Sequence, residues 1–471
     1  MQGVFLNTDM GLVSKLVTIL TRQRIRYHYN KKNWQQAKQY AQKELIHDRN
    51  TDFSNGIIFR SHWNLGEYQE VIKQLEQHPE LDDQHYYQRA KNKISTSKWS
   101  ADPVPEEVLS SVFDLKNVRK NWFQEGQRVW FRHPKGAVHW DMPMNYNLDE
   151  THDALLELAT QLLLGPFLPE VKTIRTPPRK AGKERALSYS GGVDSTAAFL
   201  MMPESTILAY HQRDFPSHLK HGNALRAISF IREQMSRPVH IFPSDHERIR
   251  INYGMDVGFS SSYAAGVHLI LVADFFNLGA LAFGTVVENT WLEKGVRFRD
   301  FANSWHWNYW PERFQHAGLC LDLPINHLTE ACTLHVCMQS ALGEVVNSCI
   351  RQDDGGCGTC WKCFHKNGPM GRFMNPNSRE IQMKLKQVPL RSGMHALWAL
   401  KNQNLTHLAP PQYAEILEQD LMWWGSIYPP GLSIISPDLR PYLTEKTEQL
   451  FNQMPRPYSI ELIDMTELFE R

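Results

Sequence analysis

The chain has 471 residues, of which 42% are hydrophobic, so its composition favours two or three folded domains and excludes a largely disordered chain. Its 51 Lys and Arg residues nearly balance 50 Asp and Glu residues, and the resulting net charge of +1 leaves nucleic acid open as a partner without indicating it. No run approaches the roughly 18 uninterrupted apolar residues of a membrane span. We therefore expect a cytoplasmic protein with no membrane partner.

The sequence of residues 1–100 predicts helices, and two stretches of it align at a spacing of 34 residues. The aligned pairs are Trp34 with Tyr68, Ala37 with Val71, and Ala41 with Leu75. This spacing is the period of tetratricopeptide (TPR) repeats, although only about two units are visible and ordinary amphipathic helices are the alternative. We expect a TPR-like helical region that offers a surface to a protein partner.

Residues 101–185 are predicted to form a connector that contains a β-hairpin and a basic segment. Two apolar and aromatic runs flank a turn at 133–136, and a helical pattern follows at 149–164. Positions 172–185 carry six basic residues, one acid and a Pro-Pro pair. That composition is typical of a solvated linker, and a flap that grips phosphates is the alternative.

From residue 186 the chain alternates between short apolar strands and helical patterns. The strands are expected at 186–190, 206–211, 238–243 and 280–285, and the helices at 196–202, 224–234 and 263–276. This order is typical of an α/β fold with a doubly wound parallel sheet, and we assign residues 186–375 to it. Residues 376–471 return to helical sequence and are expected to form a C-terminal helical extension.

The first of these strands ends in Ser190-Gly191-Gly192-Val193-Asp194-Ser195, which enters a helix. Two glycines allow the backbone to approach phosphate oxygens, and the helix N-terminus adds N–H donors and positive dipole. The serines add hydroxyl donors. Asp194 would repel phosphate, so we predict that it bridges a Mg²⁺ ion or orders the loop. The segment lacks the Lys-Ser/Thr ending of a Walker A motif and also lacks G-x-G-x-x-G.

The segment resembles the signature of the PP-loop ATP pyrophosphatases, in which ATP adenylates a carbonyl, carboxylate or amide oxygen and releases pyrophosphate. The resemblance implies ATP and Mg²⁺ as cofactors and catalytic roles for Ser190, Asp194 and Ser195. It implies nucleotide contacts from the whole loop, from the Ala209-Tyr210-His211 strand, with Tyr210 as the contact, and from Gly284 and Thr285 at a later strand end. Plain packing at strand ends is the alternative for these last contacts.

The seven cysteines all lie between Cys320 and Cys363, and four of them form a tight cluster. These four are Cys349, Cys357, Cys360 and Cys363. In a reducing compartment such a cluster indicates a metal site, and four thiolates around one zinc ion would leave no position open for catalysis. We therefore expect a small structural zinc knuckle, with an iron–sulfur cluster as the alternative.

Ser348-Cys349 followed by Cys357-Gly358-Thr359-Cys360-Trp361-Lys362-Cys363 resembles the zinc knuckle of the 7-cyano-7-deazaguanine synthases, the QueC family. The resemblance covers about residues 186–370. It implies an AMP-forming ligase that adenylates a small-molecule carboxylate, such as a 7-deazaguanine acid, and joins it to ammonia or an amine. The family's usual Thr-Lys appears here as Thr329-Glu330, which weakens the assignment of the same substrate. The helical flanks suggest a macromolecular acceptor.

Two other functions remain open. A tRNA-thiolating PP-loop enzyme would need a reactive thiol, and Cys320, Cys332 and Cys337 lie in apolar sequence that predicts buried, inert side chains. A non-catalytic ATP-binding interaction protein would use the same loop. Aromatic residues beside arginines could stack a heterocyclic ligand or pack as a lid; they are Trp291, Trp305, Trp307, Tyr309 and Trp310. His211 and His240 lie near predicted strand ends.

Overall fold

The computed structural model describes residues 6–46, 51–81, 84–98 and 104–469, so the ends of the predicted N-terminal region and the start of the connector lie outside the described residues. The contacts divide the chain into two compact units. One contains residues 1–101 and 215–218, and the other contains residues 102–214 and 219–471. Among the described residues, no helix has both the length and the apolar character that crossing a membrane requires.

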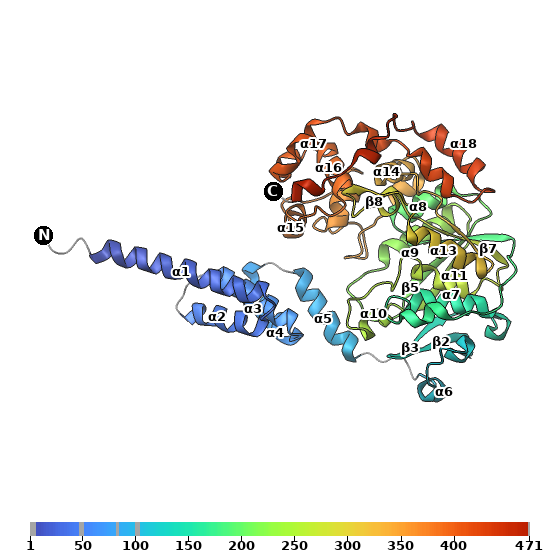
Figure 1. Cartoon of the computed structure of the whole chain (residues 1–471), viewed down its shortest axis with the longest axis horizontal. Helices are drawn as coiled ribbons and strands as arrows, with labels where there is room; N and C mark the ends of the chain where they lie inside the picture. The colour runs from blue at the N-terminus through green and yellow to red at the C-terminus, as the bar shows by residue number, and fades with distance from the viewer. Residues whose placement is uncertain (1–5, 47–50, 82–83, 99–103, 470–471) are drawn as a thin grey trace. The chain divides into compact units, whose positions relative to one another are not determined.

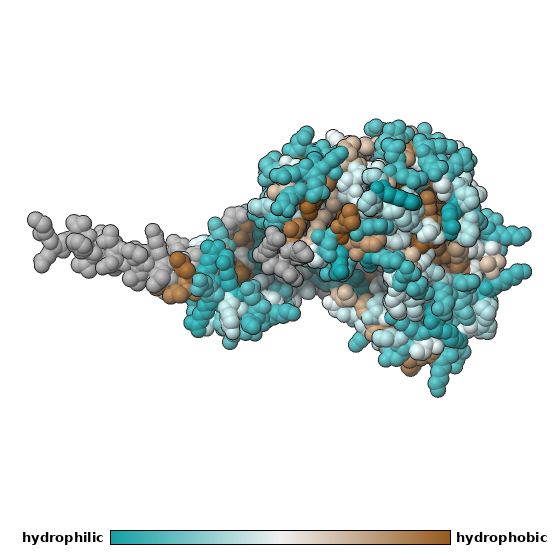
Figure 2. All heavy atoms as spheres, turned by 45° about the horizontal axis from the view of Figure 1, so that its top comes forward, coloured by the Kyte–Doolittle hydropathy of each residue, from teal (hydrophilic) through white to brown (hydrophobic). Residues whose placement is uncertain are grey.

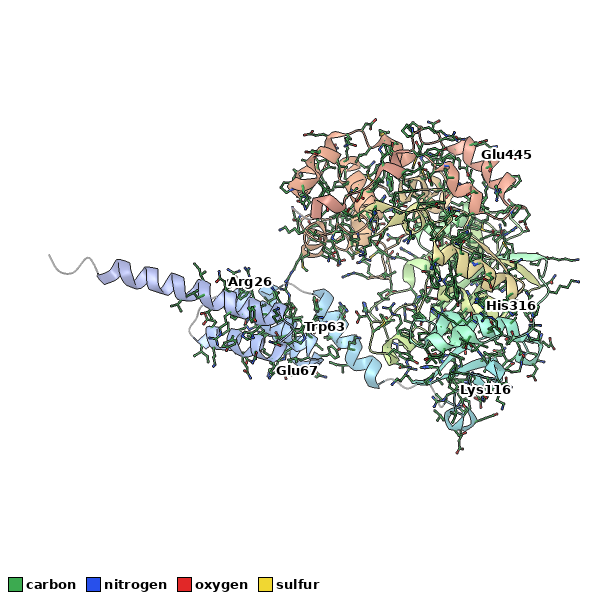
Figure 3. The ribbon with its side chains drawn as sticks, viewed as in Figure 1. Arg26, Trp63, Glu67, Lys116, His316 and Glu445 are labelled. Atoms are coloured by element: carbon green, nitrogen blue, oxygen red, sulfur yellow. The ribbon has the colours of Figure 1, made fainter. Side chains whose placement is uncertain are left out.

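The N-terminal unit consists of helices (Figure 1), namely α1 (Leu6–Asn30), α2 (Trp34–Ile46), α3 (Thr51–Asn64), α4 (Tyr68–Gln77) and α5 (Gln84–Lys98). The two stretches that align at 34 residues begin α2 and α4. Ala37, Ala41, Val71 and Leu75 of these stretches are buried. Glu67, labelled in Figure 3, accepts a hydrogen bond of 2.7 Å from Lys38 and joins α2 to the turn before α4. The TPR-like assignment stays a prediction.

The larger unit is built on an eight-stranded sheet with the order β1-β2-β3-β6-β5-β4-β7-β10. The strands are β1 (Trp122–Glu125), β2 (Arg128–His133), β3 (Gly136–Asp141), β4 (Glu184–Ser188), β5 (Ile207–Arg213), β6 (Val239–Ser244), β7 (Leu278–Phe283) and β10 (Cys320–Asp322). The five strands from β6 to β10 are parallel. Two short strands, β8 (Leu292–Glu293) and β9 (Arg297–Phe298), form a separate ribbon.

Helices cover both faces of the sheet. Successive strand residues point to opposite sides, and apolar residues on both sides need cover. In β4, Ala186 belongs to one hydrophobic cluster and Leu187 to the other, and Leu281 and Ala282 divide in the same way in β7. The helices of the two clusters are α7 (Asp153–Leu164), α11 (Val267–Leu271) and α13 (Trp305–His316) for the first, and α8 (Val193–Met201), α9 (Gly222–Gln234) and α14 (Glu330–Met338) for the second. The α/β class and the mostly parallel sheet are therefore confirmed.

The expected hairpin is present, but it is part of the main sheet. β2 and β3 pair in antiparallel register around the 133–136 turn, and β3 joins β6 through the Trp140–Ser244 pair. The sheet is therefore not wholly parallel as predicted, because β1, β2 and β3 extend it in antiparallel fashion. The predicted helix at 149–164 begins at Asp153 instead, after a 3₁₀ turn over Leu148–Glu150.

The expected helix at 263–276 is much shorter. It is reduced to a 3₁₀ turn, Ala264–Gly266, and α11. The Leu278 N–H donates to the Ala273 carbonyl at 2.7 Å, and Asn277 takes a positive φ of 52°, so the chain turns tightly into β7. A continuous apolar run fits a buried irregular segment as well as a buried helix, which explains the error.

The remaining helices of this unit are short. They are α6 (Glu106–Ser110), α10 (Arg248–Asn252), α12 (Val287–Thr290), α15 (Arg379–Leu385), α16 (Gly393–Asn402), α17 (Ala414–Glu418) and α18 (Arg440–Leu450). Buried residues from the C-terminal region, including Leu397, Tyr413 and Ile460, belong to the same hydrophobic cluster as α7. The face of this unit that Figure 2 shows is mainly hydrophilic.

Candidate functional site

The segment 190–195 forms a tight loop between β4 and α8. Gly191 has a φ of +73°, which side chains other than glycine rarely adopt. A Cβ atom on Gly191 would lie 2.5 Å from the Cα of Ala224 at the start of α9. The loop therefore needs glycine both for its backbone conformation and for its contact with α9.

Several donors of this loop are available to a ligand. The Ser190 N–H donates to the Ser195 hydroxyl at 3.1 Å, and that hydroxyl donates to the Gly192 carbonyl at 3.1 Å, which closes the turn. Among the residues that the structure describes, none accepts a hydrogen bond from the backbone N–H groups of Gly191, Gly192 and Asp194. Together with the N-terminus of α8 they have the arrangement of a backbone nest, which is suited to an anion.

A cavity of about 310 Å³ opens beside this loop, at the carboxyl ends of β4 and β5. The strand order reverses at β4, which has β5 on one side and β7 on the other, and open α/β sheets bind ligands at such reversals. The cavity is lined by Ser190, Gly191 and Gly192 of the loop, Tyr210, His211 and Arg213 of β5, Lys220, His221 and Asn223 near α9, Glu247, Phe259, and Asn347, Ser348, Cys349 and Lys362 of the cysteine segment.

Positive charge is concentrated in the wall of this cavity. Lys362 is exposed and lines the cavity, and no described residue forms an ion pair or hydrogen bond with its ammonium group. Lys220 makes one loose ion pair, 3.8 Å from Asp353. The wall is therefore suited to an anionic ligand.

The cavity lining also contains a buried ionic cluster around Glu247. Arg213 donates to both carboxylate oxygens of Glu247 at 2.6 and 2.8 Å, and the His211 Nε2 lies 3.1 Å from the nearer oxygen. Burial raises the pKa of Glu247, but the hydrogen bond from His211 and the charge of Arg213 outweigh it and lower the pKa to about 2. Tyr210 and His221 form a further hydrogen bond in this lining.

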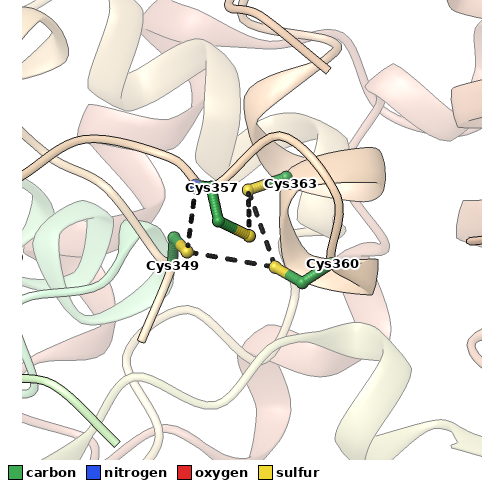
Figure 4. Close-up of side chains that lie close together, drawn as sticks. All are labelled: Cys349, Cys357, Cys360 and Cys363. Atoms are coloured by element: carbon green, nitrogen blue, oxygen red, sulfur yellow. Dashed lines mark hydrogen bonds between the residues drawn. The ribbon is translucent and has the colours of Figure 1, made fainter. Parts of the chain in front are cut away.

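The four cysteines converge as expected (Figure 4). The Sγ–Sγ distances are 4.0 Å for Cys349–Cys360, 3.8 Å for Cys357–Cys363 and 3.6 Å for Cys360–Cys363. A tetrahedral ion with metal–sulfur bonds of about 2.3 Å would separate its sulfurs by about 3.8 Å. The cluster can therefore hold one metal ion such as zinc.

The cysteine segment is hydrogen-bonded directly to the loop and helix that begin at Ser190. The Ser348 hydroxyl accepts a hydrogen bond of 3.0 Å from the N–H of Val193, the first residue of α8. The buried Asn223 side chain donates to the carbonyls of Cys349 at 2.7 Å and Gly355 at 2.8 Å and accepts from the Gly355 N–H. The knuckle therefore forms one wall of the cavity.

Asp194 points away from the nest into a buried polar network. Its Oδ1 accepts hydrogen bonds from Lys366 Nζ at 2.6 Å and from the Thr333 hydroxyl at 2.9 Å. Lys366 lies on a π-helical turn, Cys363–Asn367, and also contacts Glu330 at 3.1 Å. Burial lowers the pKa of Lys366, but Asp194 and Glu330 outweigh it and raise the pKa above its usual value. This arrangement favours the loop-ordering role for Asp194.

The network extends to Glu330, His365 and His395, which are close enough to share a metal ion. The atoms that could bind this metal already make hydrogen bonds, however. His365 Nδ1 lies 2.9 Å from Glu330, and His395 bonds to the His365 carbonyl at 2.7 Å through Nε2 and to the Trp424 indole at 3.3 Å through Nδ1. Since the Lys366 ammonium also lies against Glu330, we interpret this group as a satisfied hydrogen-bond network.

Other predicted residues lie outside the cavity. Gly284 packs against the first turn of α8, where a Cβ atom would lie 2.8 Å from the Ser195 Cα, and neither Gly284 nor Thr285 lines the cavity. His240 packs against Phe276. The aromatic residues between 291 and 310 are also absent from the lining, and Trp291 is buried with its indole bonded to Asn326.

The three cysteines outside the knuckle lie away from the cavity lining. Cys332 and Cys337 are buried as expected, and burial raises the pKa of each thiol to about 12. Cys320 is exposed on the edge strand β10, contrary to the expectation of a buried side chain. Edge strands leave alternate side chains at the surface even in apolar sequence.

Sequence reasoning missed Lys362, Lys366, Ser348 and Asn223. Two of these missed residues stand beside knuckle cysteines, and that proximity was the available signal. A model for a family of unknown function (DUF6395) matches residues 309–457, which include the knuckle, Glu330 and Lys366 but not the loop at 190–195. The chain matches no curated protein.

Proposed function

We propose that the protein is an ATP-dependent, AMP-forming ligase of the QueC-like type that adenylates a carboxylate and joins it to ammonia or an amine. The observation that carries the proposal is the set of open N–H donors at Gly191, Gly192 and Asp194 beside the cavity that Lys362 lines. Such donors bind the phosphates of a nucleotide, and they stabilise negative charge that develops on pyrophosphate as it leaves.

The reaction would proceed in two balanced steps. A substrate carboxylate oxygen attacks the α-phosphorus of ATP, and the bond to the β-phosphate oxygen breaks and releases pyrophosphate. An amine then attacks the acyl carbon, loses a proton, and displaces AMP. In both steps the loop holds the phosphates in line, and positioning of this kind supplies much of the rate.

The proposed cofactors fit the residues present. Mg²⁺ bound with ATP would neutralise phosphate charge, while Asp194, whose carboxylate bonds to Lys366 and Thr333, would keep the loop ordered. Zinc fits the sulfur spacing of the knuckle, where four thiolates leave no open position and indicate a structural role. The thiolation alternative is disfavoured because the cavity is lined by no cysteine other than the knuckle residue Cys349.

The test is mass-spectrometric detection of AMP and pyrophosphate from ATP, Mg²⁺ and a panel of carboxylates that includes 7-carboxy-7-deazaguanine. The variants are Asp194→Asn and, as a control far from the loop in sequence, Glu445→Gln on the exposed side of α18 (Figure 3). Carboxylate-dependent AMP that disappears only in Asp194→Asn supports the ligase. Nucleotide binding without AMP for every acid would instead support a non-catalytic ATP-binding protein.

A further inference from the structure

Lys362 differs from the other cations of the cavity because none of the described residues forms an ion pair or hydrogen bond with its ammonium group. Arg213 is held by two short bonds to Glu247, and Lys220 pairs with Asp353. Lys362 stands between two knuckle cysteines, Cys360 and Cys363, and its side chain lines the cavity that the loop also lines. A cation left unpaired in a cavity wall is available for an anionic ligand.

We propose that the metal-loaded cysteine knuckle is the anion-binding wall of this cavity, with Lys362 binding the phosphoryl oxygens of the ligand. The ligand class is a polyphosphate, either inorganic or part of a nucleotide. The inference rests on the proposed use of the loop for ATP, and it adds a binding residue and makes the affinity of the site depend on the metal.

The dependence on metal follows from how Lys362 is positioned. The residues on either side of Trp361-Lys362 are both sulfur ligands, so a metal ion would fix this short segment at both ends. The hydrophobic cluster at the knuckle contains Cys349, Cys360 and Cys363, with Cys357 and Met374 partly buried against it. Trp361 is buried in the main hydrophobic cluster of the unit, which anchors one residue of the segment. The apolar contacts of the sulfur ligands themselves are few, so a metal ion bound to Cys360 and Cys363 would supply the remaining energy that holds the exposed Lys362 in place.

A bound metal would also hold the loop in place through the knuckle. Ser348, next to the ligand Cys349, accepts the hydrogen bond from Val193 at the start of α8, and Asn223 ties the knuckle carbonyls to α9. A displaced knuckle would release both contacts. The metal therefore positions the Lys362 cation and also the backbone that presents the N–H donors.

The experiment measures binding of inorganic pyrophosphate and of α,β-methylene-ATP to the full chain by calorimetry, with metal content measured on the same samples. The variants are Lys362→Met, which keeps the apolar stem, Lys362→Arg, which keeps the charge, and Lys120→Met, which removes an exposed lysine elsewhere in the same unit. A charge-assisted hydrogen bond contributes about 1.5–3 kcal/mol, which corresponds to roughly a 10- to 150-fold change in affinity.

We expect Lys362→Met to retain one metal ion and the wild-type unfolding midpoint while its affinity for both probes falls at least about tenfold. Lys362→Arg should recover most of the loss, and Lys120→Met should change nothing. Chelation followed by zinc addition should abolish and then restore probe binding. Equal affinity of Lys362→Met and wild type, or failure of the wild-type protein to bind either probe, would overturn the inference.

These results separate the inference from the proposed ligase. Carboxylate-dependent AMP from a protein whose Lys362→Met variant binds pyrophosphate normally would refute the role of Lys362 and leave the ligase standing. Loss of probe binding in Lys362→Met, in a wild-type protein that forms no AMP with any acid, would support the anion wall and refute the ligase.

Discussion

Lys366→Met removes the cation that joins Asp194 to Glu330. The Glu330 side chain is 9% exposed, whereas Asp194 at 31% can regain water. Breaking a buried ion pair by removing one partner costs about 3–5 kcal/mol. The variant can limit that cost by protonating Glu330, whose ordinary pKa is 4.5. At pH 7 this protonation itself costs about 3 kcal/mol, at 1.36 kcal/mol for each pH unit.

The sign of the pH dependence follows from the same reasoning. In the wild type, burial raises the pKa of Glu330, but Lys366 and the neighbouring histidines outweigh it, and the pKa lies well below 4.5. Glu330 therefore adds no pH dependence to the free energy of unfolding between pH 5 and pH 7. In Lys366→Met a raised folded pKa makes stability fall as pH rises above the unfolded value. Besides Lys366, the titratable groups that face Glu330 are Glu288, His365 and His395.

Urea unfolding at pH 5 and pH 7 measures the effect. Lys366→Met should lose about 3 kcal/mol at pH 7 and recover most of it at pH 5, because two pH units are worth about 2.7 kcal/mol. Lys120→Met, which removes a lysine with a 66% exposed side chain, should change little at either pH. A Lys366→Met cost that is small at pH 7, or that does not depend on pH, would refute this account of the network.

Three further variants test neighbouring parts of the site. Burial and the charge of Glu330 raise the pKa of Glu288 well above 4.5, so the contribution of Glu288 to stability falls as pH rises from 5 to 8. Glu288→Gln should therefore unfold at higher urea than the wild type at pH 8 and match it near pH 5. Gly191→Ala should abolish pyrophosphate binding because its Cβ would meet Ala224. Gly126→Ala has a φ of +59° and no atom within 4 Å of a Cβ, so its loss of folding stability measures the cost of the backbone conformation alone. Equal losses of stability in the two variants would refute the role of the contact with Ala224. Because the pKa of Glu247 is lowered to about 2, its contribution is present above pH 4.5 and is lost as pH falls toward 2, so Glu247→Gln should cost up to about 3 kcal/mol at pH 7 and progressively less in acid unfolding; a constant cost would show that its charge is not what stabilises the cluster.

The sequence was informative wherever a feature is local. The hairpin at 133–136, the strands around Ser188 and Phe283 and the convergence of the four cysteines all follow from residues within about fifteen positions of one another. The Asp194–Lys366 pair joins residues 172 positions apart, and the Trp140–Ser244 pair adds the hairpin to the sheet from a distance of 104 positions. Neither contact leaves a pattern in the local sequence, so neither was predicted.

The sequence also could not predict the role of a residue when that role depends on which surface its side chain faces. Lys362 and Lys366 have the same residue type and lie four positions apart in the knuckle, yet one lines the cavity and the other is buried between two carboxylates. Lys366 lies on the π-helical turn Cys363–Asn367, whereas Lys362 precedes it. A wider turn of this kind depends on tertiary contacts and has no clear sequence signal.

Lys366 supplies the positive charge that the sequence next to Glu330 lacks. The knuckle supplies a lysine whose ammonium lies 3.1 Å from Glu330 and 2.6 Å from Asp194, so the loop acid keeps a cationic partner although the local sequence offers an acid. Because that lysine follows Cys363 by three residues, the metal site reaches the loop by two routes, through Lys366 to Asp194 and through Ser348 to Val193. A knuckle connected in both ways holds both the Asp194 side chain and the first turn of α8 in place.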